Sequence, residues 1–458
     1  MKAFTFFVLF IILGLSIQDS IYSMCTMFIR PIQIPKVTYL APGLSKGDKG
    51  LYNEVTRVVL ARDGKRSVMG ISSDYRGNFK EFSMLVPVPS LIKKNQIHVG
   101  ENQFFDRLHG FTSPLFEVKQ DLSPCLRMQP SLRKANGHAE SVAPFGADLK
   151  PIKNNYSVKV EASYSIGEYD IQILSSQDSK ALVSWLKHNG YYVPKLMENT
   201  LEPYIKQNMK FFVAKVNLQN QLSSGLNYLR PLLFAYESEK FILPIRPGMV
   251  NAKGEQELYA YILNPTGRVE TSNYRNVEIP TGKDLPEHIA SELDTFYREM
   301  FLHLVKKEDK KVVFTEFAGK ANVCSRTFCP QLPLKKEELL NLGAFWLSDV
   351  PDFGIQPEVY VTRLHIRYNS QTFPEDISFI ETNDKKEFSI RYKIRKAWKG
   401  SENSCSVAGA YFKNLKIHQE KSLKNLIILT GRNENEERKK MGLNYRSNKT
   451  DWWKTIWN

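Results

Sequence analysis

One predicted strand places cations at every second position, a spacing that can form a binding or catalytic site. The period of two of a strand over 359–368 puts on one face Arg363, His365 and Arg367. The opposite face, with Leu364 and Ile366, is the expected core face. Glu375 and Asp376 lie in the following loop and could return to pair with the cations. A solvated face with salt bridges is the favoured interpretation, and a ligand-binding or catalytic site is the alternative.

A second polar and aromatic group surrounds Gly167. It consists of Tyr164, Glu168, Tyr169 and Asp170. A carboxylate pair beside tyrosines can bind sugars or act in acid–base chemistry. A turn between two strands collects the same residue types for structural reasons, and this interpretation is favoured.

Familiar catalytic motifs are absent or incomplete. Two S-x-x-K matches, at 90–93 and 131–134, lack the partner motifs of the penicillin-binding enzymes. His138 and Glu140 form half of a zinc deaminase signature without the cysteine half. No G-x-S-x-G, H-E-x-x-H, P-loop or dinucleotide fingerprint occurs. The sequence therefore implies no cofactor and no metal, and it argues against a familiar hydrolase or nucleotide enzyme.

The five cysteines favour disulfide chemistry over metal binding. Cys324 and Cys329 are predicted to close a small disulfide loop, because a zinc site needs a second ligand pair. Cys25, Cys125 and Cys405 remain, and three thiols cannot all pair within one chain. One of them is free, acylated or intermolecular.

The N-terminus has the layout of a secretory signal peptide. Lys2 precedes an uncharged apolar run at 3–15, and polar residues lead to a small residue, Ser23. Residues 1–23 are the predicted signal peptide, and the protein is predicted to be periplasmic, in the outer envelope or secreted. Cys25 offers a lipoprotein alternative, in which the acylated thiol begins the mature chain, although bulky Met24 disfavours it. No later segment approaches the ~18 consecutive apolar residues of a spanning helix.

The pattern of elements predicts an α+β protein, mainly antiparallel sheet with inserted helices. Asp63-Gly64 between two β-branched runs predicts a hairpin over 56–73. An N-terminal β-rich region is expected over 24–280, with a long surface connection at 126–155. A helix-richer region is expected over 281–458. The predicted helices span 102–109, 286–307, 419–429 and 433–441, and the longest amphipathic one is 286–307. A further helix is predicted to be capped by Ser175 and to stop at Asn189-Gly190.

Several blocks, in this order, resemble a bacterial exported family catalogued as domain of unknown function number 2330. They include TRVVLARDG at 56–64, FSMLVPVP at 82–89, YLRP at 228–231, FILPIRPG at 241–248 and VTRLHIRY at 361–368. The resemblance covers nearly the whole mature chain and implies an exported bacterial protein with no assigned activity. The family tends to have several cysteines after the signal peptide and a tight C-x-x-C, from which Cys25 and the Cys324–Cys329 spacing depart. Some relatives end in a membrane-anchoring tail, which is absent here.

Positive charge concentrates near the C-terminus. The chain has 63 Lys and Arg against 48 Asp and Glu, a net charge of +15, and residues 391–458 hold 16 against 6. Four of the six tryptophans lie there: Trp398, Trp452, Trp453 and Trp457. This combination suits an anionic membrane surface or envelope polymer, and export argues against nucleic acid. The alternative is that the tryptophans dock onto the body of the protein.

Two function classes follow from these features. An exported envelope protein without catalysis, binding an anionic surface or a protein partner, is favoured by the charge distribution and the missing motifs. An envelope enzyme of unrecognised, hydrolase-like type is the alternative. It requires the residues around Arg363 and His365 to converge in a cleft with Glu375 and Asp376.

Overall fold

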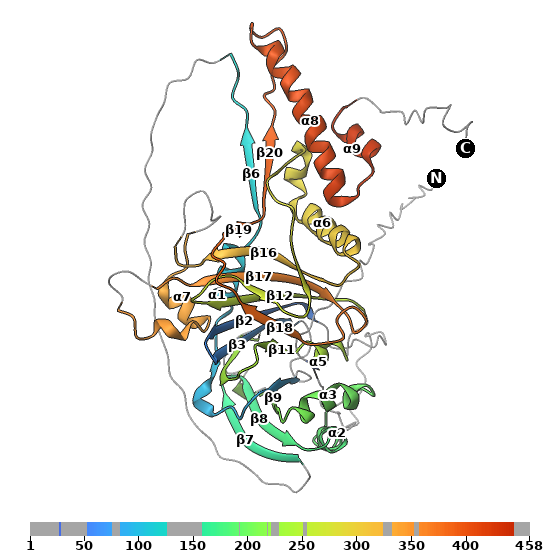
Figure 1. The fold of residues 1–458 in the computed structure, drawn as a ribbon. Helices are drawn as coiled ribbons and strands as arrows, with labels where there is room; N and C mark the ends of the chain where they lie inside the picture. The colour runs from blue at the N-terminus through green and yellow to red at the C-terminus, as the bar shows by residue number, and fades with distance from the viewer. Residues whose placement is uncertain are drawn as a thin grey trace, which may run out of the picture.

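The computed structural model describes residues 27–28, 53–75, 83–125, 158–191, 193–217, 219–220, 229–250, 254–323, 332–351 and 357–443. Several predictions fall outside these ranges: the signal peptide, the connection 126–155, Cys25, the Cys324–Cys329 pair and the last three tryptophans. Within the described ranges, two sheets lie face to face. Helices cover the outer face of each sheet, and an arm extends away from them (Figure 1).

The smaller sheet has the strand order β1-β4-β9-β8-β7, and all its pairings are antiparallel. Its strands are β1 (Met27–Phe28), β4 (Ser83–Val88), β7 (Val158–Ile166), β8 (Tyr169–Ser176) and β9 (Lys210–Val216). Alternation along β9 divides its side chains between two cores. Phe211 packs with helices α2 (Ser179–His188) and α3 (Met197–Lys206), whereas Phe212 packs against the larger sheet.

The larger sheet has the order β14-β16-β17-β12-β2-β3-β10-β5, and β19 also pairs with β16. Its strands are β2 (Asn53–Asp63), β3 (Arg66–Tyr75), β5 (Ile97–Val99), β10 (Leu232–Glu237), β12 (Gln256–Asn264), β14 (Arg275–Glu278), β16 (Val312–Lys320), β17 (Tyr360–Tyr368) and β19 (Phe388–Ser389). The β12–β2 and β14–β16 pairings are parallel. Strands from both sides of residue 280 contribute, so the two predicted regions share this sheet.

Helices and short strands complete the body. Helices α1 (Asn102–Phe111) and α7 (Lys336–Asn341) pack on the outer face of the larger sheet, and α6 (Leu293–Lys307) packs against β16. A small sheet has the order β11-β18-β13. The remaining elements of the body are β11 (Ile242–Leu243), β13 (Val269–Thr271), β18 (Ile377–Glu381), α5 (Arg246–Met249) and 3-10 turns at Lys94–Gln96, Glu287–Ser291 and Phe345–Leu347.

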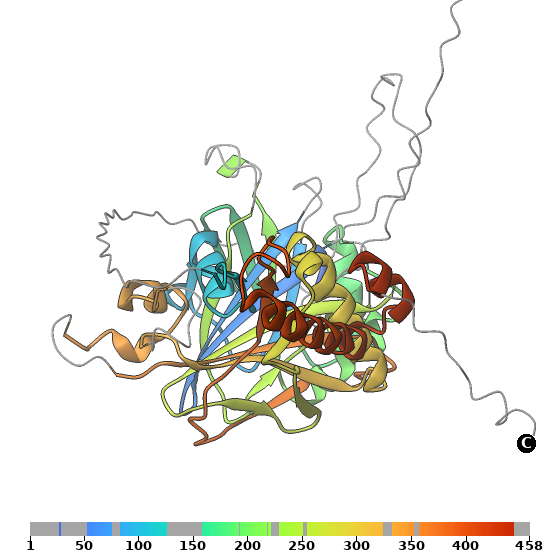
Figure 2. The same cartoon turned by 90° about the horizontal axis from the view of Figure 1, so that it is seen from above.

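The arm comprises residues 115–125 and 391–430. It contains β6 (Leu115–Gln120), β20 (Arg391–Lys396) and α8 (Ala408–Thr430). Strand β20 pairs in parallel with β6 and, at the other edge, with β15 (Lys283–Leu285). Helix α8 returns from the end of the arm and packs on α6, and α9 (Glu434–Lys440) follows beside it (Figures 1 and 2). A disulfide between Cys125 and Cys405 links the segment after β6 to the loop before α8.

The local signals in the sequence are largely confirmed. The hairpin turns at Gly64, whose φ of +60° explains the glycine, and Asn433 caps α9. The mixed helix and strand content is confirmed, but the parallel pairings were not predicted. The predicted cap at Ser175 is wrong: Asp178 caps α2, and its carboxylate accepts from the Ala181 N–H. The longest helix described is α8, not the predicted 286–307, and it begins at Ala408, eleven residues before the predicted start.

Candidate functional site

Strand β17 is buried on both faces, so the predicted outward cationic face is wrong. Arg363 is 2% exposed and His365 is 1% exposed. The Leu364 face packs between the two sheets as expected. The cationic face is covered too, by α6, whose Phe301 stacks on His365, and by the end of α1, whose His109 carbonyl accepts from Arg363.

A buried carboxylate, Glu316, pairs with these cations. Glu316 lies in β16, whose register with β17 shifts between Thr315 and Phe317. Glu316 is therefore the extra residue of a β-bulge, and this bulge turns it toward the cations of β17. Glu316 is 1% exposed. One carboxylate oxygen lies 2.6 Å from Arg363 Nε, and the other lies 2.6 Å from His365 Nδ1 and accepts from the Tyr297 hydroxyl.

His365 is held on all sides. Its second nitrogen, Nε2, lies 2.8 Å from Glu257 Oε1. Its ring lies between those of Phe301 and Tyr259, at centroid distances of 3.5 and 4.1 Å. The next cation along the strand, Arg367, continues the network through a 2.7 Å hydrogen bond to Glu255. We call Glu316, Arg363, His365 and Glu257 the ionic cluster.

The charges in the ionic cluster stabilise one another. Burial alone would raise the pKa of Glu316, but Arg363 and His365, with hydrogen bonds from His365 and Tyr297, lower it to about 2. Burial alone would lower the pKa of His365, but Glu316 and Glu257 raise it above its usual value. The imidazole therefore stays protonated more readily than a solvated histidine, and both its ring nitrogens donate.

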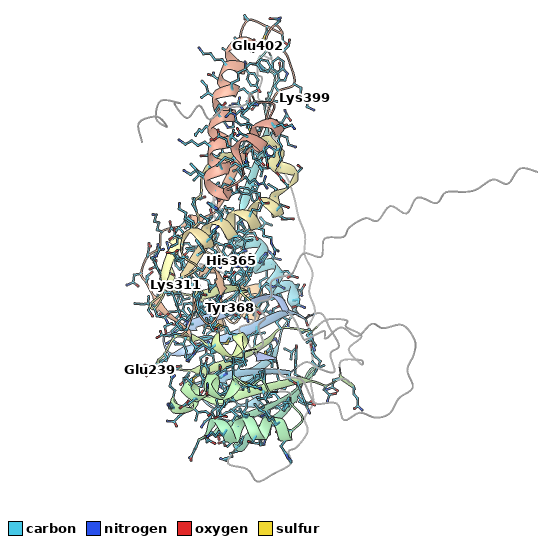
Figure 3. All side chains as sticks on the ribbon, turned by 90° about the vertical axis from the view of Figure 1, so that its right-hand side faces the viewer. Glu239, Lys311, His365, Tyr368, Lys399 and Glu402 are labelled. Carbon is cyan, nitrogen blue, oxygen red and sulfur yellow. A yellow bond between two sulfur atoms is a disulfide. The ribbon has the colours of Figure 1, made fainter. Side chains whose placement is uncertain are left out.

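The ionic cluster is closed to ligands in this structure. Its cations are fully enclosed, and the larger cavities among the described residues are lined by other side chains. In Figure 3, His365 lies within the body, far from the end of the arm. Buried ionic networks of this kind fix side-chain packing and strand geometry. The side chains of the ionic cluster lack the access that contact with a substrate requires.

The two predicted acidic partners lie elsewhere. Asp376 accepts from the Tyr204 hydroxyl and from the backbone and guanidinium of Arg246. Glu375 accepts from Asn273. The predicted return of Glu375 and Asp376 to the strand cations is therefore wrong, because those cations already have carboxylates from β12 and β16.

The polar group around Gly167 also makes internal contacts. Glu168 is buried and binds Arg230 through Oε2 at 2.8 Å, and the Tyr169 hydroxyl donates to the Arg230 carbonyl. Asp170 accepts from Ser165 and Asn217. These contacts tie the β7–β8 turn to the segment before β10, as the structural interpretation expects.

The arm presents the most distinctive surface. It carries 10 Lys and Arg against 4 Asp and Glu. Along the outer side of α8, five exposed residues recur at intervals of three or four and therefore share one face: Lys413, Ile417, Lys421, Lys424 and Ile428. We call them the basic face. Ile417 is 63% exposed and Ile428 is 56% exposed.

The basic face was not predicted, because the expected helix began at residue 419 and a start at Ala408 is needed to reveal the spacing. Glu316 was not predicted either, although a carboxylate in the apolar run VVFTEFAG was a signal for it. Trp398 packs against Tyr411 and Phe412 of α8, which places it inside the arm. Trp452, Trp453 and Trp457 lie outside the described residues, as does the Cys324–Cys329 pair.

Within the described ranges, no helix is long and apolar enough to cross a bilayer. The fold and surfaces define a mixed α/β protein of two stacked sheets with a basic, disulfide-linked arm. The chain belongs to the family described as "Uncharacterized protein conserved in bacteria" (DUF2330), which matches residues 41–380. Most of the arm lies after the matched segment.

Two further comparisons add little. No curated protein matches the chain. Among solved structures, a mutated baculovirus P35 after caspase cleavage is similar over 48% of this chain and 76% of its own, with 12% sequence identity and a TM-score of 0.23.

Proposed function

We propose that this protein is exported and binds an anionic surface of the cell envelope through the basic face of its arm. The observation that carries the proposal is the lysine spacing along α8, with two exposed isoleucines on the same face. This pattern is typical of helices that lie on anionic surfaces.

Export is supported by two independent features. The first is the N-terminal sequence, with one cation, a short apolar run and a small residue at the expected cleavage point. The second is the Cys125–Cys405 disulfide, because such bonds persist in oxidising compartments and are rare in the cytosol. A non-reducing peptide map of the mature protein tests export: a Cys125–Cys405 peptide and loss of the first 23 residues are expected.

The lysines of the basic face are available to bind an anionic partner. Lys413 and Lys424 form no ion pair with any residue that the structure describes, and Lys421 reaches Asp284 at 3.2 Å while remaining 69% exposed. An exposed pair of this kind contributes little and competes weakly with a partner. Each lysine near an anionic membrane surface contributes about 1 kcal/mol, so three contribute about 3 kcal/mol at moderate salt.

Vesicle co-sedimentation tests the binding. The full-length protein is mixed with phosphatidylcholine vesicles with or without phosphatidylglycerol. Sedimentation is expected only with phosphatidylglycerol and is expected to fall as salt rises. The variant K413E/K421E/K424E reverses three charges of the basic face and is expected to bind at least tenfold more weakly.

A charge-matched control variant distinguishes the effect of the basic face on binding from the effect of the protein's net charge. K180E/K187E/K195E changes the same number of exposed lysines near α2, at the opposite end of the molecule from the arm (Figure 1). This variant is expected to retain most of the binding. Failure of the wild-type protein to sediment with anionic vesicles, or an equal loss in both variants, would contradict the proposal.

A further inference from the structure

Exposed apolar side chains collect on the arm. Of the large apolar side chains that are exposed within the described ranges, half lie there: Val118, Leu122, Val407, Ile417 and Ile428. The arm makes up 51 of the 328 residues that the structure describes. Single exposed apolar residues are ordinary on a protein surface, but their concentration on one projecting element indicates an interaction site.

Two of these side chains lie at the end of the arm, beside the disulfide. Leu122 precedes Cys125 by three residues and is 68% exposed, and Val407 follows Cys405 by two residues and is 50% exposed. The two cysteines have their Cα atoms 5.9 Å apart. The disulfide therefore holds both apolar residues near one point. We call Leu122, Val407 and the disulfide the tip.

The local structure explains why Leu122 points outward. The backbone pairing of β6 with β20 continues to Asp121, whose N–H donates to the Lys396 carbonyl. The Asp121 carboxylate accepts from Arg395 and from the Tyr411 hydroxyl of α8, so it turns toward the interior of the arm. In extended chain the next side chain takes the opposite side, and that is Leu122.

Two exposed lysines lie on the same part of the arm as the tip. Lys399 lies near the far end of the arm, with Glu402 beyond it (Figure 3). Lys399 is exposed and forms no ion pair within the described part of the chain, and Lys413 begins the basic face on the first turns of α8. An apolar point with exposed lysines behind it matches the layers of a bilayer with anionic headgroups, where the apolar region lies just below the charge. An anionic polymer offers the charge without the apolar layer.

We propose that the tip inserts Leu122 and Val407 into a lipid bilayer, while the lysines of the arm contact anionic headgroups. The partner of the arm is then a membrane, not a polymer. This inference rests on the proposed function and specifies the partner and the mode of contact. The disulfide keeps the two apolar side chains together, so both enter at once.

The test compares two pairs of substitutions. L122S/V407S removes the apolar tip, and L196S/I380S removes two exposed aliphatic side chains from the body, where Leu196 is 66% and Ile380 is 53% exposed. Both leave the net charge and the disulfide unchanged. With vesicles of phosphatidylcholine and phosphatidylglycerol, L122S/V407S is expected to bind at least tenfold more weakly than the wild type, and L196S/I380S within about threefold of it.

A depth measurement gives an independent readout. In L122W, the added tryptophan is expected to be quenched by phosphatidylcholine brominated on its acyl chains. L196W, which adds a tryptophan at an exposed position of the body, is expected to show no added quenching. Wild-type binding is also expected to keep a salt-resistant fraction, which L122S/V407S lacks.

The possible failures are distinguishable. If the wild-type protein does not bind anionic vesicles at all, the proposed function fails. If the wild type binds but L122S/V407S binds equally well and L122W is not quenched, the proposed function stands and tip insertion is overturned. If L196S/I380S loses the binding to the same extent as L122S/V407S, the loss does not come from the tip, and tip insertion is again overturned.

Discussion

Glu316→Gln is expected to destabilise the protein strongly while changing few atoms. The pKa of Glu316 is lowered from 4.5 to about 2, which corresponds to about 3 kcal/mol in favour of the ionised form at about 1.4 kcal/mol per pH unit. The side chain is fully buried, so solvent does not screen this contribution. Removing one partner of a buried ion pair leaves Arg363 without its counter-charge, which typically costs about 3–5 kcal/mol. We therefore expect the free energy of unfolding to fall by about 3 kcal/mol.

The sign of the pH dependence follows from the direction of the shift. Because the pKa of Glu316 is lower in the folded state, its stabilisation is complete above about pH 4.5 and is lost as the pH falls toward 2. The raised pKa of His365 acts in the opposite sense: its contribution is present below the usual histidine range and is lost as the pH rises through the folded value. The ionic cluster is therefore most stabilising at mildly acidic pH.

Urea unfolding between pH 2.5 and 6, followed by far-UV circular dichroism, measures the effect. The difference between wild type and E316Q is expected to be about 3 kcal/mol at pH 6 and to shrink toward pH 2.5. E299Q serves as a control, because Glu299 pairs with Arg432 at a partly exposed site and should change stability by less than about 1 kcal/mol. A difference below 1 kcal/mol at pH 6, or one that stays constant with pH, would refute the assignment of Glu316 as the central charge.

Two further predictions concern other parts of the fold. Asp376→Ala removes a carboxylate that accepts from the Tyr204 hydroxyl, two backbone N–H groups and Arg246. Urea titrations should show that the free energy of unfolding falls by about 2–4 kcal/mol. A loss below about 1 kcal/mol would contradict these contacts. Gly343→Ala should cost more than about 1 kcal/mol, because φ is +95° and the added Cβ would lie 2.7 Å from Val68 Cγ1. Gly64→Ala, with φ of +60° but open space around it, should cost less, and the reverse order would be inconsistent with the packing at Gly343.

Local signals predicted local structure, and pairing between distant segments was beyond their reach. Asp63-Gly64 and Asn433 mark a turn and a cap through their own backbone geometry, so the sequence suffices to find them. The parallel pairing of β12 with β2 joins segments about 200 residues apart, and no periodicity encodes it. The first turns of α8 were not predicted because the projecting helix buries few of its side chains there. Exposed Ile417 and half-buried His418 therefore obscure the regular spacing of buried apolar residues that marks a helix.

The candidate site illustrates the same limit in more detail. A period of two correctly grouped Arg363 and His365 on one face of β17, but the sequence of a strand does not say whether its second face is covered. That depended on α6, which supplies Phe301, and on the bulge in β16, which turns Glu316 toward the cations. Three cations on one strand therefore mark a buried network here, because carboxylates arrive from the two neighbouring strands.

The ionic cluster and the arm are connected through α6, which links the buried charges to the stability of the base of the arm. One side of α6 carries Tyr297 and Phe301, which contact Glu316 and His365. Its other contacts reach the last turns of α8, where Leu426 and Leu429 join the same apolar core. Arg432, just after α8, binds Glu299 of α6 at 2.6 Å. Substitutions in the ionic cluster should therefore loosen the base of the arm before they alter its exposed residues, and vesicle binding by E316Q should fall only as far as its folded population falls.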